Sequence, residues 1–196
     1  DEEAQNIAKI VLQSNPHVKA VMQQTSPVAG ELRLRRLKWL AGEKRTETVH
    51  GEFGCLLKVD LEKCYFSPRL GFERMRVAKQ VKTDEVVVNM FAGVGCFSIL
   101  IAKHANPSKV YSVDVNPDAI RFMKENINLN KVRYILEAIR GDAKIVVEER
   151  LRNVADRVLM PLPEKAFEYL DAALVALKSR GGTIHYYDFS YAKKGV

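Results

Sequence analysis

The stretch that decides the fold reads Asp84-Glu85-Val86-Val87-Val88-Asn89-Met90-Phe91-Ala92-Gly93-Val94-Gly95-Cys96-Phe97-Ser98. A run of β-branched residues leads to Asn89, two glycines interrupt it, and an apolar segment follows over residues 96–104. This order predicts a strand, a tight turn and a helix, which together open a βαβ unit. Gly93 and Gly95 let the backbone approach a ligand closely, and the helix start leaves N–H groups unpaired.

A second predicted strand, over residues 109–115, contains Asp114, which lies 21 residues after Gly93. An acidic side chain at a strand end can accept hydrogen bonds from ribose hydroxyls. The turn has neither a third glycine nor a Lys-Ser/Thr pair, so it favours a nucleoside without a pyrophosphate. S-adenosylmethionine is the commonest ligand of that kind. Two alternatives stay open: the glycines serve packing alone, and Asp114 caps the helix that follows.

The alternation of strand and helix continues to the end of the chain. Further strands are predicted over residues 135–139, 155–160 and 183–189, and further helices over residues 117–129, 143–151 and 164–179. The sequence therefore predicts an α/β fold of the Rossmann-like type with a parallel sheet. A sheet that ended at its fifth strand would leave an edge unpaired, so we expect additional residues beyond Val196.

Residues 1–66 predict a small α+β domain, which is followed by a Rossmann-like domain over residues 67–196. Its pattern indicates a helix over residues 2–13 and strands over residues 17–23, 31–40, 44–50 and 55–59. The second of these strands alternates as Leu32-Arg33-Leu34-Arg35, which places two arginines on one side. At the join, Ser67 and Pro68 suit the N-cap and first turn of a helix that reaches residue 82. The first residue is Asp1 rather than Met, and the sequence opens inside this helix, so we expect a missing upstream module.

Positive charge is concentrated in one quarter of the chain. Residues 31–82 contain 13 Lys and Arg against 7 Asp and Glu, so six of the seven net positive charges lie there. Such a segment favours a polyanionic partner, because each neutralised phosphate releases counterions; a merely solvated basic face is the alternative. Neither a run of 18 apolar residues nor a leader pattern is present, which disfavours membrane and secreted classes.

The cysteines and histidines have no spacing typical of a metal site or a disulfide framework. The three cysteines are odd in number and lack a CxxC pair, and the four histidines are scattered. We therefore expect no metal and a cytoplasmic location.

Two segments, taken together, resemble the archaeal and eukaryotic tRNA (guanine-N1)-methyltransferase family, which acts on guanine 37 beside the anticodon. They are Tyr65-Phe66-Ser67-Pro68-Arg69-Leu70 followed by Glu73-Arg74, and Asn89-Met90-Phe91-Ala92-Gly93-Val94-Gly95. The resemblance extends from residues 30–42 to residues 182–186. It implies a class I S-adenosylmethionine-dependent methyltransferase domain behind an RNA-positioning domain, with the anticodon-loop region of tRNA as the partner. We expect a monomer.

The resemblance also implies roles for individual residues. Glu73 matches the general base that removes the proton from guanine N1, and Arg33 or Arg35 matches the arginine that stabilises the guanine oxygen. The substrate pocket is matched by Tyr65, Arg69, Arg74, Leu162 and Pro163, and the cofactor site by Phe91, Gly93, Gly95, Asp114, Val115, Asp142 and Ala143. In the alternative interpretations, Glu73 forms an ion pair with Arg69 or Arg76, and the two arginines contact phosphates.

One departure from the family concerns Pro161. The family usually has Asn-Leu-Pro or Asn-Pro-Pro-Tyr after the fourth strand, whereas this chain has Pro161-Leu162-Pro163. Proline removes a side-chain amide that would hold the base and leaves only a backbone carbonyl as acceptor. The Pro-Leu-Pro form resembles the archaeal branch of wyosine biosynthesis, whose members can also methylate the tricyclic precursor 4-demethylwyosine at C7. We therefore expect this chain to methylate both substrates.

Three other functions compete with this interpretation. The wyosine-pathway aminocarboxypropyl transferase uses the same cofactor, but Leu162, Pro163 and Glu73 favour methyl transfer. A non-catalytic tRNA-binding module would explain the basic segment equally well. A methyltransferase for proteins or small molecules would leave that segment unexplained.

Overall fold

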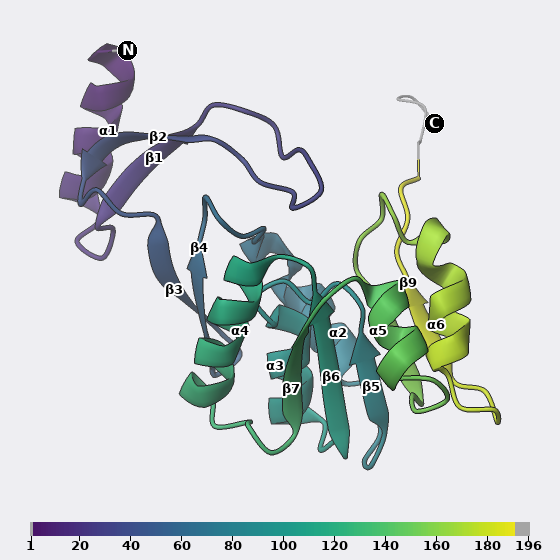
Figure 1. Cartoon of the computed structure of the whole chain (residues 1–196). Coiled ribbons are helices and arrows are strands. Elements are labelled where there is room, and N and C mark those ends of the chain that lie inside the picture. The colour runs from purple at the N-terminus through teal and green to yellow at the C-terminus, as the bar shows by residue number, and fades with distance from the viewer. Residues whose placement is uncertain (1, 191–196) are drawn as a thin grey trace, which may run out of the picture.

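The structure is a computed structural model that describes residues 2–190 (Figure 1). Its centre is a sheet of five parallel strands: β5 (Val86–Asn89), β6 (Lys109–Asp114), β7 (Leu136–Arg140), β8 (Arg157–Met160) and β9 (Thr183–Tyr186). Their order is β7-β6-β5-β8-β9, so the chain moves outward from β5 to β7 and then crosses to the other side. Such a reversal opens a crevice at the carboxyl ends of the strands, where ligands bind in α/β proteins.

Helices cover both faces of this sheet, as the predicted α/β class requires. One face is covered by α2 (Gly71–Ala78), α3 (Cys96–His104) and α4 (Pro117–Leu129), and the other by α5 (Ala143–Arg150) and α6 (Leu170–Ala176). Neighbouring strand residues point to opposite faces, so Val87 packs in the first cluster and Val88 in the second. Both valines are fully buried.

The sequence predicted α3 and α4 with their observed bounds. Glycine and proline explain this accuracy, because Gly95 stands in a left-handed conformation just before α3, and Pro117 occupies the first turn of α4. The other elements of the sheet domain were predicted with ends that differ by a few residues. The predicted helix over residues 164–179 is shorter, with a 3-10 turn (Phe167–Tyr169) before α6.

The predicted strand over residues 31–40 is wrong in its first half. The N-terminal unit contains α1 (Glu2–Ser14) packed on an antiparallel pair, β1 (Ala20–Gln24) and β2 (Leu37–Gly42). Residues 30–34 instead form a turn in which Gly30 has φ 74° and Arg33 has φ 53°. The Arg33 N–H donates to the Gly30 carbonyl at 3.0 Å, which closes the turn. The alternation of leucine and arginine is compatible with a strand and with such a turn, so the sequence pattern could not distinguish the two.

The predicted helix over residues 67–82 also needs correction. Pro68–Leu70 is a 3-10 turn, α2 follows it and ends at Ala78, and the Ser67 side chain makes no cap hydrogen bond. Ser67 contributes its carbonyl instead, which accepts a hydrogen bond from Arg74 at 2.6 Å.

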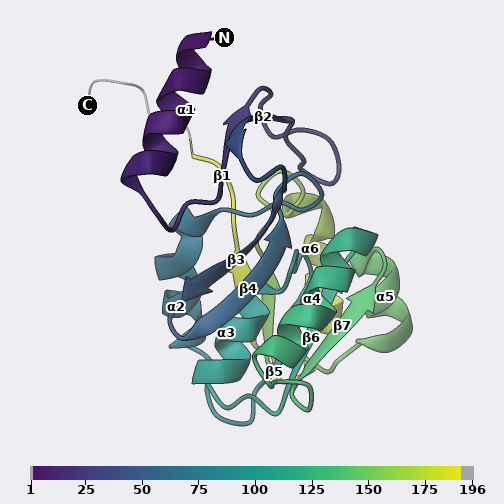
Figure 2. The ribbon, with the colours of Figure 1, turned by 90° about the vertical axis from the view of Figure 1, so that its left-hand side faces the viewer.

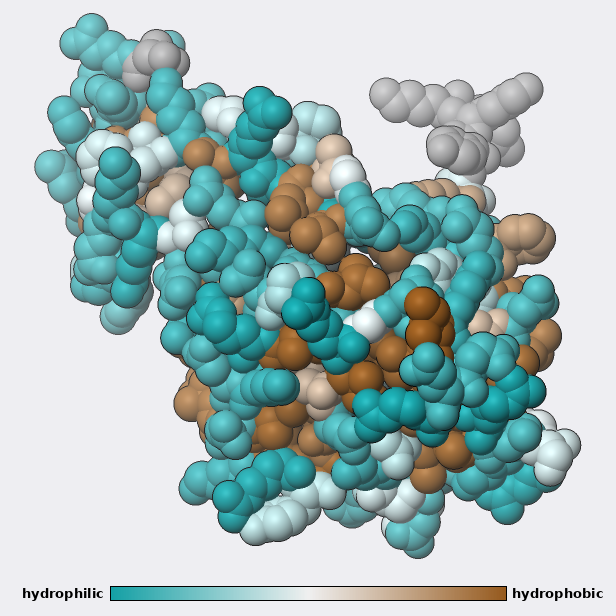
Figure 3. All heavy atoms as spheres, in the orientation of Figure 1, coloured by the Kyte–Doolittle hydropathy of each residue, from teal (hydrophilic) through white to brown (hydrophobic). Residues whose placement is uncertain are grey.

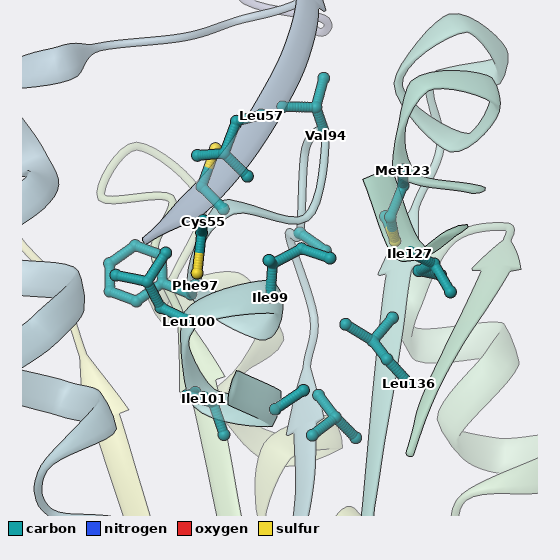
Figure 4. Close-up of a cluster of buried hydrophobic side chains, with 14 of the residues drawn as sticks. Cys55, Leu57, Val94, Phe97, Ile99, Leu100, Ile101, Met123, Ile127 and Leu136 are labelled. Atoms are coloured by element: carbon teal, nitrogen blue, oxygen red, sulfur yellow. The ribbon is translucent and has the colours of Figure 1, made fainter. Parts of the chain in front are cut away.

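A hairpin of β3 (Glu47–Glu52) and β4 (Cys55–Asp60) packs against the sheet domain (Figure 2). Cys55 and Leu57 of β4 lie in the same apolar cluster as Ile99 of α3 and Met123 of α4 (Figure 4). The hairpin is thus part of the main core. The domain boundary after residue 66 stays a prediction.

Two asparagines, Asn126 of α4 and Asn130 at its C-cap, form hydrogen bonds with the main chain of β4 as a neighbouring strand would. Asn126 accepts from the Lys58 N–H at 2.7 Å and donates to the Lys58 carbonyl at 3.0 Å. Asn130, one turn later, accepts from the Leu56 N–H at 2.9 Å and donates to its carbonyl at 2.7 Å. Asn126 also donates to the carbonyl of Val94, inside the glycine turn, at 3.0 Å. The exposed edge of β4 is therefore closed by side chains.

Gly95→Ala is expected to destabilise the protein by about 2–4 kcal/mol, from a strained backbone and a steric clash. Gly95 has φ +90°, and a Cβ there would lie 2.9 Å from Cγ of the buried Met123. Gly54→Ala is the matched control, since Gly54 has φ +72° with nothing within 4 Å of its Cβ position. Urea unfolding of both variants would separate the clash from the backbone cost. Equal losses would contradict the steric argument.

Candidate active site

A pocket lies at the carboxyl edge of the sheet, under the turn that connects β1 and β2. It encloses about 650 Å³ of space, part of it open to solvent, which is in the size range of small-molecule sites. Figure 3 shows hydrophobic atoms gathered at the junction of the N-terminal unit and the sheet domain, with polar atoms around them. The predicted residues that line the pocket are Arg33, Tyr65, Phe91, Gly93, Asp114, Val115, Asp142, Ala143, Pro161 and Leu162.

Asp114 is held at the end of β6 by two main-chain donors. Its Oδ2 accepts from the Gly93 N–H at 2.7 Å, and its Oδ1 accepts from the Asn116 N–H at 2.9 Å. Burial raises the pKa of this carboxyl above its ordinary value, although both hydrogen bonds act in the opposite direction. Each oxygen keeps a further lone pair, so the carboxylate can accept from two more hydroxyls. The site thus fits the ribose of the implied cofactor, and the predicted alternative in which Asp114 caps the next helix is wrong, because Asn116 is the N-cap.

Asp142 caps α5 and anchors an aromatic wall of the pocket. Its Oδ1 accepts from the Lys144 N–H at 2.8 Å, and its Oδ2 accepts a hydrogen bond from the Tyr169 hydroxyl. The Tyr169 ring stands edge-on to Phe91, with centroids 5.0 Å apart, and both rings line the pocket. Burial and the Asp142 carboxylate raise the pKa of Tyr169. Sequence reasoning missed Tyr169, because it lies 27 residues after Asp142 without any motif around it.

Arg33 and Arg35 converge on the ring of Tyr65. The guanidinium carbons lie 4.3 Å and 5.9 Å from the ring centroid, which is the geometry of a cation–π contact. Arg35 also donates to the Phe66 carbonyl at 2.9 Å. Within residues 2–190, the buried Nε atom of each arginine has no hydrogen-bond partner. Arg33 lines the pocket and Arg35 does not, so Arg33 is the better placed of the two predicted arginines.

Two ion pairs tie the turn at residues 30–34 to the segment after β8. Arg33 pairs with Glu164 at 3.0 Å, and Lys165 pairs with Glu31 at 3.3 Å. Both pairs are partly exposed, so each contributes little to stability. Their effect is geometric, since they hold Arg33 beside the Pro161-Leu162-Pro163 segment. Glu31, Leu32 and Lys165 also line the pocket and were not predicted from the sequence.

Glu73 lies on α2, outside the pocket lining, with its carboxylate held by two residues. Arg76 donates to it through Nε at 2.6 Å and Nη2 at 2.7 Å, and the Tyr187 hydroxyl donates at 2.6 Å. The Arg76 hydrogen bonds, with a smaller contribution from Tyr187, hold the pKa of Glu73 below its ordinary value despite partial burial. The predicted ion pair with Arg76 is present. The predicted role of Glu73 as general base stays a prediction.

Four other predicted site residues lie outside the pocket lining: Arg69, Arg74, Gly95 and Pro163. Arg69 is exposed in the 3-10 turn that precedes α2. Arg74 is buried, and its guanidinium forms hydrogen bonds with Glu52 at 2.7 and 2.8 Å and with the Ser67 carbonyl. These bonds give Arg74 an internal structural role, and its substrate role stays a prediction.

Residues 2–190 contain neither a metal-binding cluster nor a membrane-spanning helix. No three His, Cys, Asp or Glu side chains in this part of the chain are grouped so that they could hold a metal ion. None of its helices is long and apolar enough to cross a bilayer. The cysteines Cys55, Cys64 and Cys96 are free and buried.

Comparison with known proteins places residues 48–194 in one family model, described as the TRM5/TYW2 methyltransferase domain. The chain is 46% identical to the tRNA (guanine(37)-N(1))-methyltransferase Trm5b of Pyrococcus abyssi, over 95% of this chain and 54% of that protein. It is 43% identical to the tRNA 4-demethylwyosine(37)-methyltransferase Taw21 of Saccharolobus solfataricus, over 99% of this chain and 72% of that protein. The chain thus spans about half the length of the Trm5b relative.

Two solved structures show the same architecture. The complex of aTrm5 with tRNALeu superposes with a TM-score of 0.86 at 43% identity, covering 96% of this chain and 54% of that one. TYW2 of Methanocaldococcus jannaschii in complex with AdoMet superposes with a TM-score of 0.70 at 42% identity, covering 76% of this chain and 66% of that one. The predicted class I methyltransferase fold is confirmed.

Proposed function

Because this chain belongs to the TRM5/TYW2 methyltransferase family, we propose that it transfers a methyl group from S-adenosylmethionine to N1 of guanine 37 in tRNA. One observation carries this proposal: a single pocket is lined by Asp114 at the end of β6, by Asp142 just after β7, and by Arg33 and Tyr65 from the N-terminal part of the chain. The first pair suits a nucleoside cofactor, and the second suits a planar base with a carbonyl oxygen. The two reactants would therefore meet at the carboxyl edge of the sheet.

Different pocket residues would contact different parts of the cofactor. Asp114 would accept hydrogen bonds from the ribose hydroxyls, and Val115 and Ala143 would enclose the adenine, with Asp142 at its amine. Phe91 and Gly93 also line the pocket, and glycine lets the main chain approach a ligand closely. When bound, S-adenosylmethionine supplies an activated methyl group through its own sulfonium. The protein contributes orientation, which converts a bimolecular reaction into a unimolecular one.

The charges that the reaction needs would come from Arg33, which lines the pocket, and from Glu73 on α2, outside its lining. Guanine N1 becomes nucleophilic only when its proton leaves, and Glu73 would accept that proton. Negative charge then moves to the guanine oxygen, where Arg33 would stabilise it with a guanidinium whose Nε has no partner in the described residues. Tyr65 offers an aromatic face on which a flipped base can stack. The basic segment over residues 31–82 would hold the tRNA backbone.

A second substrate is favoured by Pro161 and by the Taw21 relative. Pro161 lines the pocket and has no side-chain amide. We infer that its place in the lining would accommodate a ring system larger than guanine. We therefore propose that the chain also methylates 4-demethylwyosine at C7. Pro161→Asn should shift the ratio of the two activities toward guanine. A protein that is inert toward tRNA carrying the tricyclic base would exclude the second substrate.

The function is tested by methyl transfer from labelled S-adenosylmethionine to two tRNA transcripts, one with guanine and one with adenine at position 37. Label on the guanine transcript alone would support the proposal. Cofactor binding without label on either transcript would direct attention to the tricyclic substrate, with the tRNA-binding module as the remaining possibility. Transfer of an aminocarboxypropyl group, detected by mass spectrometry, would favour the rival transferase.

Asp114→Asn is expected to weaken binding of S-adenosylmethionine about 10–100-fold, because an amide offers one acceptor oxygen where the carboxylate offers two. Isothermal titration calorimetry would measure the change. The raised pKa of Asp114 also predicts how cofactor affinity depends on pH. The affinity of the wild type should fall as the pH drops through that pKa, because the protonated carboxyl loses acceptor capacity. Asp118→Asn, in the exposed first turn of α4, is the control and should bind normally. Equal affinities of all three proteins would contradict the ribose assignment.

A further inference from the structure

Within the described residues 2–190, the carboxylate of Glu73 has one acceptor position left. Its Oε1 accepts from the Tyr187 hydroxyl at 2.6 Å and from Arg76 Nη2 at 2.7 Å. Its Oε2 accepts from Arg76 Nε at 2.6 Å and from no other residue that the structure describes. An ionised carboxylate has about four lone-pair sites, so the remaining one is on Oε2. The carboxylate is therefore fixed in orientation without being saturated.

The two donors reach Glu73 from different parts of the fold. Arg76 lies one turn away on α2, so its ion pair moves with the helix and cannot place the carboxylate relative to the sheet. Tyr187 directly follows β9 and lies 114 residues from Glu73. The Tyr187 ring also stands edge-on to Phe97, with centroids 6.1 Å apart, in the first turn of α3. Tyr187 thus connects the edge strand of the sheet, the helix behind the glycine turn and the carboxylate on α2.

We propose that Tyr187 is the positioning residue for Glu73, which it holds so that the free site on Oε2 takes the proton from guanine N1. This inference rests on the function proposed above. The Tyr187 hydroxyl remains protonated, because burial and the Glu73 carboxylate raise its pKa, so it acts as a donor throughout. In the transfer step the N1–H bond breaks, its electron pair stays on N1, and an O–H bond forms at Glu73 Oε2.

The charges around Glu73 determine how its titration responds to the loss of Tyr187. Arg76 on α2 is the cation nearest to the carboxylate, and His185 on β9 acts weakly in the same direction. Burial and the neighbouring Arg157 lower the pKa of His185 to about 4, so this imidazole is neutral near pH 7. Arg76 remains when the Tyr187 hydroxyl is removed. The pKa of Glu73 should then rise, since one hydrogen bond to its ionised form is lost.

The experiment compares Tyr187→Phe with Tyr186→Phe in the methyl-transfer assay across pH. Tyr186 is the neighbouring residue, and its hydroxyl donates instead to Asp188 at 3.1 Å. Tyr187→Phe should lower kcat about tenfold, the scale of one lost hydrogen bond to a charged group, with KM for tRNA unchanged. The acidic limb of its pH–rate profile should move to higher pH, because the base must be ionised to act. Tyr186→Phe should match the wild type in both.

Two outcomes would overturn the inference. One is a Tyr187→Phe variant with wild-type kcat and an unshifted pH profile; the other is equal losses in the two tyrosine variants. If the wild type transfers no methyl group to guanine-37 tRNA, the proposed function fails by itself. A ¹³C titration of the Glu73 carboxyl in Tyr187→Phe then decides the positioning role separately, because an unchanged pKa would exclude it.

Discussion

Glu73→Gln is expected to reduce methyl transfer to guanine-37 tRNA by a factor of about 10²–10⁴, the usual contribution of a general base. Glutamine keeps the size and much of the hydrogen bonding of glutamate, yet its amide does not accept a proton. Binding of S-adenosylmethionine should remain normal, since Glu73 lies outside the pocket lining. Single-turnover kinetics with labelled cofactor would measure the loss.

The same variant distinguishes the base from the plain ion pair. The pair with Arg76 is partly exposed, with Glu73 at 26% and Arg76 at 46% side-chain exposure, so its loss should cost at most about 0.5 kcal/mol. Glu125→Gln on α4 is a matched control, because it also breaks exposed pairs, with Lys58 and Arg121. Full activity of Glu73→Gln would show that Glu73 is only half of a surface ion pair. Inactivity with unchanged stability would identify the base.

Arg74→Ala is expected to lower the free energy of unfolding by roughly 3–5 kcal/mol, the usual cost of removing one partner from a buried ion pair. The Arg74 side chain is 3% exposed and that of Glu52 is 7% exposed. Alanine would leave the Glu52 carboxylate buried without its bidentate partner and the Ser67 carbonyl without its donor. Urea denaturation would measure the change.

A matched surface change separates this effect from loss of charge alone. Arg152→Ala removes an arginine from an exposed pair with Glu148 and should cost less than about 1 kcal/mol. If Arg74→Ala were as stable as Arg152→Ala while KM for tRNA rose, Arg74 would bind substrate, as the resemblance implies. A large loss of stability would instead assign Arg74 to holding α2 against the β3–β4 hairpin.

The sheet domain was largely predictable because its signals are local. Gly95 and Pro117 mark where α3 and α4 begin, and the apolar pattern of each segment marks the helix that follows. The alternation of strand and helix likewise places Asp114 and Asp142 where a strand gives way to a helix. The turn at residues 30–34 was not predictable, because an alternating sequence pattern does not reveal that the backbone of Arg33 has a positive φ. The contacts of Tyr169, Glu164 and Tyr187 were missed for another reason. Each contact joins segments that are distant in sequence, and local secondary-structure propensities carry no information about such contacts.

The asparagine contacts of α4 have a consequence for how this protein can be divided. Asn126 and Asn130 each exchange hydrogen bonds with the main chain of the hairpin strand β4, and Asn126 also donates to a carbonyl of the glycine turn. A chain shortened to begin at residue 67 would strip these amides of their partners and uncover the core around Ile99. None of these asparagine hydrogen bonds involves a described residue before β3. We therefore expect a stable shortened form of this chain to keep the hairpin and to begin close to residue 48, where the family match begins.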